Sequence, residues 1–248
     1  MLHASKDLTS IDKTRKEYII SYWNERAEGF TTLRSHELHS EKYHLWKDEI
    51  IRHIPDHSLR ILDVGCGAGF FSMLLASMGH TVVGIDMSSN MIAASYRLAN
   101  SEGYQIDFQL MDAERLLFEN NFFDVVIARN VTWNLPNPCH AYQEWLRVLK
   151  RNGILLNYDA DYAKNHATQL SVKSHAHKDI SPTLLAKCQS IYEILPMSHY
   201  TRPDWDKEIL EQYHPQQCIV DTTVGSRIYE LEDEFYITAP MFCIKAIK

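Results

Sequence analysis

The stretch ILDVGCGAGFFSMLLASMGHTVVGID, residues 61–86, decides the fold of this chain. It begins with a short apolar run, continues through a loop that holds Gly65, Gly67 and Gly69 and through a helical pattern, and closes a second apolar run at Asp86. A strand, a tight loop, a helix and a second strand in this order are typical of a parallel sheet covered by helices. The stretch therefore predicts a doubly wound α/β fold, in which ligands bind beyond the carboxyl ends of the strands.

The same alternation continues after this stretch. Three further apolar runs of strand length follow, with amphipathic helical patterns between them, and two more runs end the chain. We expect strands at 60–64, 81–86, 105–110, 122–128, 153–158, 216–224 and 235–248, and helices at 70–79, 89–103 and 138–153. Ser88 or Ser89 can cap the second of these helices, and Gly153 should end the third.

The overall composition of the chain excludes or disfavours several classes of protein. A net charge of −7 argues against general nucleic-acid binding, which needs Lys and Arg to neutralise phosphates. The 5 cysteines are scattered without a CxxC pair, which favours free thiols in a reducing compartment over a disulfide framework. The polar start of the chain does not resemble a signal peptide, and no apolar run reaches membrane-spanning length. We therefore expect a cytoplasmic protein that does not bind membranes.

The glycine loop and the acidic residues around it point to an adenosine-containing ligand. Glycines let the backbone approach a ligand closely, and the following helix N-terminus offers free N–H groups. Asp86, at the end of the second strand, can accept hydrogen bonds from both ribose hydroxyls. The spacing departs from G-x-G-x-x-G, because the third glycine comes one step early. Asp63 suits the cationic ammonium and sulfonium of a cofactor better than a pyrophosphate.

These motifs resemble those of class I S-adenosylmethionine-dependent methyltransferases of the small-molecule type. LDVGCGAG and VVGIDMS are similar to the first two motifs of that family, and MDAERLLF to the third. FDVVIARNVTWNL and WLRVLKRNGILL are similar to its fourth and fifth strands with their flanking segments. The resemblance implies a seven-stranded sheet with an antiparallel last strand, and methyl transfer from S-adenosyl-L-methionine to a small-molecule nucleophile by in-line displacement.

The resemblance and the motif positions together give a set of candidate cofactor-binding residues. Met87 should pack on the adenine, and the adenine edge should meet the carboxylate of Asp112 and the backbone of Ala113. For Met87 the alternative is ordinary core packing, and for Asp112 it is a helix cap. The candidates are Tyr22, Asp63, Gly65, Cys66, Gly67, Gly69, Asp86, Met87, Asp112, Ala113 and Asn130.

Two other functions remain open at this point. A nicotinamide-dependent oxidoreductase would also use the glycine loop and Asp86, although Asp112 would then have no obvious task. A non-catalytic S-adenosylmethionine-binding module would keep the sheet without the reaction. Thermal shifts with S-adenosylhomocysteine and with the two nicotinamide dinucleotides separate these possibilities, because only a bound ligand stabilises the fold.

The segments outside the core are expected to form the substrate side of the site. We interpret the chain as a single methyltransferase domain, 1–248. Its expected parts are an N-terminal helical lid (11–54), a cofactor-binding core (59–159), an inserted cap and substrate region (160–215) and closing strands (216–248). In the lid, Tyr22 could reach the cofactor. Arg26, one turn later, could meet the cofactor carboxylate, but its position is more typical of a solvated helix face.

The substrate and catalytic candidates are supported by less specific sequence patterns than the cofactor-binding candidates are. Trp133 follows the fourth strand and could face the sulfonium, with half-burial beside Pro136 as the alternative. Tyr200 and Arg202 could bind a substrate anion, unless this segment is only a helix start. His199 and Tyr158 are candidate bases, and no residue is clearly catalytic. We expect no metal site, because the histidines lack partner ligands at recognisable spacing.

Overall fold

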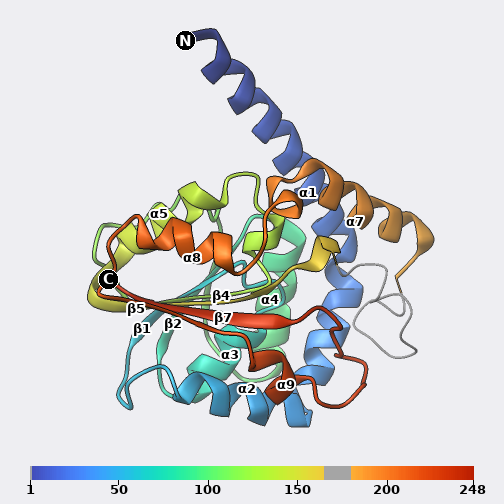
Figure 1. Cartoon of the computed structure of the whole chain (residues 1–248). Coiled ribbons are helices and arrows are strands. Elements are labelled where there is room, and N and C mark those ends of the chain that lie inside the picture. The colour runs from blue at the N-terminus through green and yellow to red at the C-terminus, as the bar shows by residue number, and fades with distance from the viewer. Residues whose placement is uncertain (1, 165–179) are drawn as a thin grey trace.

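The computed structural model describes residues 2–164 and 180–248 and forms a seven-stranded sheet with helices on both faces (Figure 1). The strand order is β3-β2-β1-β4-β5-β7-β6. Strands β1 to β5 pair in parallel, and β7 runs antiparallel to β5 and β6. The predicted doubly wound fold with an antiparallel last strand is confirmed. The strands are β1 (Arg60–Val64), β2 (Thr81–Asp86), β3 (Asp107–Leu110), β4 (Phe123–Arg129), β5 (Leu149–Ala160), β6 (Gln217–Asp221) and β7 (Met241–Ile247).

Two hydrophobic layers hold the sheet. Alternate residues of a strand point to opposite faces, so β1 sends Ile61 to one layer and Leu62 to the other. The first layer packs under α2, α3, α4 and α9, and the second under α5 and α8. Both layers are buried, which explains why the central strands β1 and β4 are nearly continuous apolar runs. The helices are α2 (Glu41–Ile51), α3 (Phe70–Ser77), α4 (Ser89–Ser101), α5 (Pro138–Val148), α8 (Asp204–Glu211) and α9 (Val224–Ile228).

Local signals set most helix boundaries. The Ser88 side chain accepts a hydrogen bond from the N–H of Met91, which confirms it as the N-cap of α4. The prediction that the third helix runs to Gly153 is wrong, because α5 ends at Val148. Leu149 is fully buried and pairs with Phe123 of β4, with a register shift after this pair. Sheet pairing therefore overrides the helical pattern of this segment.

The closing segments are also shorter than their apolar runs predict. Strand β6 ends at Asp221, and α9 begins at Val224, which the sequence placed in the strand. Strand β7 begins at Met241 rather than at Phe235. Pro240 directly precedes it, and proline has no N–H to donate to a sheet. The sheet pairing in the described chain therefore starts only after this proline.

The N-terminal segment forms one long helix, α1 (Leu2–Leu38), followed by α2. The first turns of α1 project from the body, and the rest crosses beside α4 and α7 (Pro182–Ile194) (Figure 1). Ser40 caps α2 by accepting from the N–H of Lys42. The helix begins earlier than the predicted lid at 11–54, and its second half lies over the carboxyl ends of the strands.

Polar contacts tie α1 to the sheet edge. The ammonium of Lys16 lies 2.6 Å from an oxygen of Asp112 and 2.5 Å from one of Glu114. The hydroxyl of Ser88 donates to the amide oxygen of Asn24 at 2.7 Å. These contacts place the buried side of α1 above the loops that follow β1, β2 and β3.

The inserted segment adds a second layer over the same edge. Helix α7 packs against α1, and Cys188, Ile191 and Tyr192 of α7 join Ile19 and Tyr22 of α1 in one apolar cluster. The short helix η2 (Pro196–His199) and then α8 follow. In the described part of the chain, no helix is long and apolar enough to span a membrane.

Candidate functional site

The loop after β1 takes a conformation that only glycine adopts without strain. Gly65 has φ +62°, and a Cβ added there would lie 2.5 Å from a methyl carbon of Val131. Gly67 has φ +54°, and its added Cβ would lie 3.1 Å from the ring of Phe30 on α1. The two glycines therefore allow the loop after β4 and the helix α1 to close over the end of β1. This is the point where the strand order reverses.

Two carboxylates lie at the ends of β1 and β2 beneath this loop. Asp86 accepts hydrogen bonds from the N–H of Gly67 at 3.0 Å and of Ser88 at 2.8 Å. Burial raises the pKa of Asp86 to about 6. Asp63 accepts from the hydroxyl of Ser72 at 2.6 Å, and burial raises its pKa to about 7. Both carboxylates thus lie in an environment that disfavours their negative charge.

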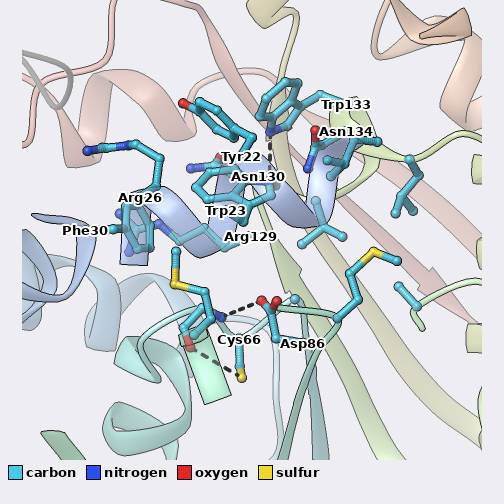
Figure 2. A pocket seen from close by; sticks show the side chains of 18 of the residues that line it. Tyr22, Trp23, Arg26, Phe30, Cys66, Asp86, Arg129, Asn130, Trp133 and Asn134 are labelled. Carbon is cyan, nitrogen blue, oxygen red and sulfur yellow. Dashed lines mark hydrogen bonds between the residues drawn. The ribbon is translucent and has the colours of Figure 1, made fainter. Parts of the chain in front are cut away.

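A single pocket brings most of the predicted cofactor residues together (Figure 2). Figure 2 shows the rings of Tyr22, Trp23 and Trp133 above Asp86 and Cys66. The pocket lies between α1, the loops after β1, β2 and β4, and α7. Predicted residues in its lining are Tyr22, Asp63, Gly65, Cys66, Gly67, Asp86, Met87, Ala113, Asn130 and Trp133.

Two of the predicted cofactor residues lie beside the pocket rather than in its lining. Gly69 precedes α3 with φ +87°, and an added Cβ would meet Phe108 at 3.0 Å. Asp112 accepts from the N–H of Glu114 at 2.9 Å and pairs with Lys16. In this structure Gly69 allows close packing of α3, and the carboxylate of Asp112 fastens α1.

Helix α1 contributes more to the pocket than the sequence indicated. Tyr22, Arg26, Phe30 and Arg34, spaced four residues apart, all line it. The expectation that Arg26 lies on a solvated face is wrong, because the residue is only 8% exposed. The spacing of these four residues was the available signal, since side chains four apart share one face of a helix.

Further lining residues come from segments without a recognisable motif. Arg129 is the last residue of β4, and Asn134 lies in the short helix η1 (Thr132–Asn134) that follows it. The hydroxyl of Tyr162 donates to the side-chain oxygen of Asn130 at 2.6 Å. Tyr192 reaches the pocket from α7, and its ring centroid lies 5.2 Å from that of Trp133. These contacts join segments far apart in sequence, so no local pattern could reveal them.

Arg202, a predicted anion-binding residue, lies outside this pocket. Its guanidinium donates twice to Asp206 at 2.8 Å, lies 3.1 Å from an oxygen of Asp159, and donates to Thr132 at 2.6 Å. Its side chain is 1% exposed, and those of both aspartates are fully buried. These bonds occupy Arg202 in a network that fixes α8 to the sheet and to η1. The geometry therefore assigns it a structural role.

Three further candidates, the substrate residue Tyr200 and the bases His199 and Tyr158, are also placed away from the pocket. Tyr200 is 38% exposed and stacks on Trp205 at 4.7 Å between ring centroids. His199 lines a separate surface groove between α1 and α7. Tyr158 is fully buried in the core, with its ring centroid 5.2 Å from that of Trp46. None of the three lines the pocket described above.

The cysteines and histidines give no sign of a second chemistry in the described residues. Burial raises the pKa of the Cys66 thiol well above its ordinary value, so it stays protonated beside the glycine loop. Among residues 2–164 and 180–248, no group of three His, Cys, Asp or Glu side chains is arranged to hold a metal ion. The histidine cluster of the insertion, His166, His175 and His177, lies outside the described residues.

The pocket fits the adenosine cofactor that the motifs predict. Met87, Met91, Met111 and Ala113 give an apolar surface at the ends of β2 and β3, which suits an adenine ring. Asp86 adjoins that surface and suits a ribose. Four buried polar groups of the lining lack a hydrogen-bond partner within the described protein: the Nε atoms of Arg26, Arg34 and Arg129, and Oδ1 of Asn134. Orphaned buried groups of this kind are typical of a ligand site.

The raised pKa values lead to a testable pH dependence. A folded-state pKa above the ordinary value means that protons stabilise the unliganded fold, and this stabilisation is lost as the pH rises through about 6 to 7. A ribose or an ammonium instead requires the ionised carboxylates of Asp86 and Asp63. We expect S-adenosylhomocysteine to bind at least about tenfold more weakly at pH 5 than at pH 8, measured by calorimetry, because protonation of Asp86 alone accounts for a factor of about ten. Equal affinities at both pH values would contradict these roles.

Sequence comparisons agree with this geometry. Residues 62–157 match a protein-family model described as a methyltransferase domain. The demethylmenaquinone methyltransferase of Leptospira interrogans is 30% identical over 173 residues, which cover 65% of this chain and 70% of that protein. The ubiquinone biosynthesis O-methyltransferase of Agrobacterium fabrum is 38% identical over 85 residues, which cover 34% of each chain.

Solved structures share the fold at low sequence identity. An S-adenosylmethionine-dependent methyltransferase of Thermotoga maritima aligns with 92% of this chain and 99% of its own, at a TM-score of 0.59 and 15% identity. The phosphoethanolamine N-methyltransferase 2 of Haemonchus contortus, crystallised with S-adenosyl-L-methionine, aligns with 82% of this chain and 52% of its own, at a TM-score of 0.57 and 19% identity. With the glycine loop, the carboxylates and the family match combined, this chain belongs to the class I S-adenosylmethionine-dependent methyltransferases and methylates a small molecule.

Proposed function

We propose that the methyl acceptor is a planar, hydroxylated aromatic ring of the phenol or quinol class. The observation that carries this proposal is the aromatic enclosure above the glycine loop. Tyr22 and Trp23 come from α1, Trp133 from η1, Tyr162 from the segment after β5, and Tyr192 from α7. Five aromatic side chains from four separate segments favour a flat apolar ligand, because rings pack through offset or edge-to-face contacts.

The arrangement of the rings supports this ligand class. The ring centroids of Trp133 and Tyr162 lie 5.5 Å apart, and those of Tyr22 and Trp23 lie 5.1 Å apart, both pairs edge-to-face. The two relatives are named for the methylation of demethylmenaquinone and for ubiquinone biosynthesis, which are quinone chemistry. An acceptor with a hydroxylated ring agrees with both observations.

S-adenosylmethionine supplies the electrophilic methyl group and its leaving group when it is bound. The chain has to bind, orient and shield the reactants. Asn130, with φ +61°, accepts from Tyr162 through its side chain and from the indole N–H of Trp133 at 2.9 Å through its carbonyl. These bonds fix the loop after β4, where the acceptor would meet the methyl group. Orientation in line at about 3 Å can supply several kcal/mol of the barrier reduction.

The roof of the pocket serves to exclude water. Ile19 and Tyr22 are each 1% exposed, and Tyr192 is 6% exposed. Methyl transfer from a sulfonium spreads charge in the transition state, so a dry enclosure favours it over the separated reactants. We therefore assign α1 and α7 the task of covering the acceptor after it binds.

The compartment is a further part of this proposal. All five cysteines are free in the structure, and Cys66, Cys188 and Cys243 are buried. Free thiols support a reducing compartment such as the cytoplasm.

An acceptor screen tests the proposed substrate class. Purified enzyme with S-adenosylmethionine would be offered phenols, catechols and reduced naphthoquinones, and in parallel aliphatic amines and thiols of similar size. We expect S-adenosylhomocysteine to form with the hydroxylated rings and not with the aliphatic compounds. Turnover restricted to the amines or thiols would reject the aromatic acceptor while leaving the family assignment intact.

A tryptophan substitution tests the enclosure itself. Trp133→Ala should lower kcat/KM for an aromatic acceptor about tenfold or more, because it removes ring contacts and admits water. Its dissociation constant for S-adenosylhomocysteine should change less than about threefold, which corresponds to less than one hydrogen bond. Trp205→Ala is the matched control, since Trp205 stacks on Tyr200 outside the pocket. Equal losses in both variants would contradict the role of Trp133.

A further inference from the structure

Two arginines at one end of the pocket share a single carboxylate. Arg34 lies on α1 and Arg129 at the end of β4, and both line the pocket. Arg34 donates to Glu37, and Arg129 donates to the same carboxylate at 2.7 Å and 3.3 Å. Arg129 also donates to the hydroxyl of Tyr229 at 3.1 Å. We call Arg34 and Arg129 the arginine pair.

The arginine pair is buried and incompletely bonded. The side chains of Arg34 and Arg129 are 8% and 9% exposed, and that of Glu37 is fully buried. The Nε atoms of both arginines are buried and have no hydrogen-bond partner within the described protein. Burial and the nearby Arg129 charge lower the pKa of Arg34, against the opposing effect of Glu37. A buried guanidinium with an unused donor is a built site for an oxyanion.

The surrounding rings hold the pair in place. The guanidinium of Arg129 lies 4.6 Å from the ring centroid of Trp46 and 5.2 Å from that of Phe70. That of Arg34 lies 4.8 Å from the ring centroid of Phe30. Rings attract a cation but do not neutralise it, so one excess positive charge remains on the group formed by the pair and Glu37.

The cofactor does not account for this excess. The described pocket and the groups bonded to it contain three guanidiniums, with Arg26 as the third, and three carboxylates, those of Glu37, Asp63 and Asp86. S-adenosylmethionine carries one carboxylate, one ammonium and one sulfonium, so its binding adds a net positive charge. The occupied pocket therefore retains one unbalanced positive charge, which favours an anionic acceptor over a cationic one.

We propose that the arginine pair binds a carboxylate substituent of the aromatic acceptor and thereby selects acidic substrates. This inference rests on the proposed function for the ring, and it adds the charged group that the ring carries. Guanidinium and carboxylate match in shape and form short charge-assisted hydrogen bonds.

Arg26 is the better partner for the single carboxylate of the cofactor. Its orphaned Nε lies on the same face of α1, one turn before Phe30. Phe30 covers Gly67 of the glycine loop, whereas Arg34 lies one turn beyond it and stacks on its ring. In Figure 2, Arg26 and Phe30 lie together on one side of the pocket, with Arg129 next to them. Along α1, Phe30 therefore lies between Arg26 and Arg34.

Paired probes test this inference without knowledge of the true acceptor. Enzyme saturated with S-adenosylhomocysteine would be titrated in a calorimeter with 4-hydroxybenzoate and with 4-hydroxybenzamide, which has the same ring but no charge. We expect the carboxylate to bind about tenfold or more tightly, because bonds to charged groups are the stronger ones. Arg34→Gln should reduce this preference to less than about threefold. Arg34→Lys keeps the charge and should retain part of it.

Two controls separate a local effect from a general one. Arg97→Gln changes a surface arginine that pairs with Glu28, and it should leave the preference unchanged. S-adenosylhomocysteine should bind Arg34→Gln with wild-type affinity, and this binding also shows that the variant is folded. It should bind Arg26→Gln more weakly than it binds the wild type. If Arg34→Gln weakens S-adenosylhomocysteine as much as Arg26→Gln does, the pair serves the cofactor and the inference is wrong.

The remaining outcomes distinguish this inference from the proposed function. Equal binding of 4-hydroxybenzoate and 4-hydroxybenzamide would overturn the carboxylate site but leave the aromatic acceptor in place. Binding of aliphatic carboxylates such as hexanoate, with no binding of either aromatic probe, would overturn the aromatic acceptor and support the anion site.

Discussion

Asp86→Ala is expected to weaken S-adenosylhomocysteine binding by about ten- to a hundredfold. A carboxylate that accepts hydrogen bonds from both ribose hydroxyls contributes more than neutral hydrogen bonds do. The side chain also holds the glycine loop in shape, because it accepts from the N–H of Gly67 at 3.0 Å and from that of Ser88 at 2.8 Å. The variant therefore loses ligand contacts and loop geometry together. Isothermal titration calorimetry at pH 8, where Asp86 is ionised, measures this effect.

The control for Asp86→Ala is Asp107→Ala. Asp107 is an exposed aspartate at the start of β3, at the opposite end of the sheet from the site. It should leave the affinity unchanged. If Asp86→Ala binds S-adenosylhomocysteine as tightly as the wild type, then Asp86 does not hold the ribose, and the cofactor would have to lie elsewhere in the pocket.

Arg202→Met is expected to lower the free energy of unfolding by about 3–5 kcal/mol, the usual result of removing one partner from a buried ion pair. The change leaves Asp159 and Asp206 buried without a cation, although Tyr142 and Thr132 still donate to them. Burial already raises the pKa of Asp159, and loss of the Arg202 charge should raise it further in the folded variant. The loss should therefore be larger at pH 8 than at pH 5, because protonation relieves the burial of charge. Urea unfolding at the two pH values measures it.

Arg97→Met is the comparison for this loss. Arg97 forms an exposed ion pair with Glu28, so its removal should change the free energy of unfolding by less than about 1 kcal/mol. A stable Arg202→Met variant with a raised KM for an anionic acceptor would instead favour the substrate role that the sequence suggested. In that case the buried network would not be what holds α8 in place.

The fold could be predicted because its signals are local. A few consecutive apolar residues indicate each buried strand. Ile61 and Leu62 of β1, for example, face opposite layers of the core. The N-cap Ser88 begins α4 by accepting a hydrogen bond from the N–H of Met91, only three residues further along the chain. The prediction was wrong where pairing with distant strands overrides the local pattern, as at Leu149, whose partner is Phe123.

The cofactor half of the site shows the same division. Asp63 and Asp86 lie at the ends of β1 and β2, and Gly65 and Gly67 come just after β1. Because all parallel strands end at one edge of the sheet, the meeting of these residues could be predicted from the motif. Asp112 follows its strand as expected, yet its carboxylate pairs with Lys16, a residue 96 positions away. The motif predicted the position of the Asp112 backbone. The partner of the Asp112 side chain depended on where α1 crosses the sheet edge.

The sequence by itself determined the sheet, its glycine loop and the class of cofactor, because each rests on spacing within a short stretch of chain. Only the tertiary structure decided the acceptor side. It turned Arg26 and Arg34 inward, joined Arg129 to Glu37 across 92 positions, and placed Arg202 in a buried network with Asp206. The role of a charged side chain depends on the groups that contact it in the folded protein. Those groups come from segments far away in the sequence, and no local pattern specifies which segments will meet.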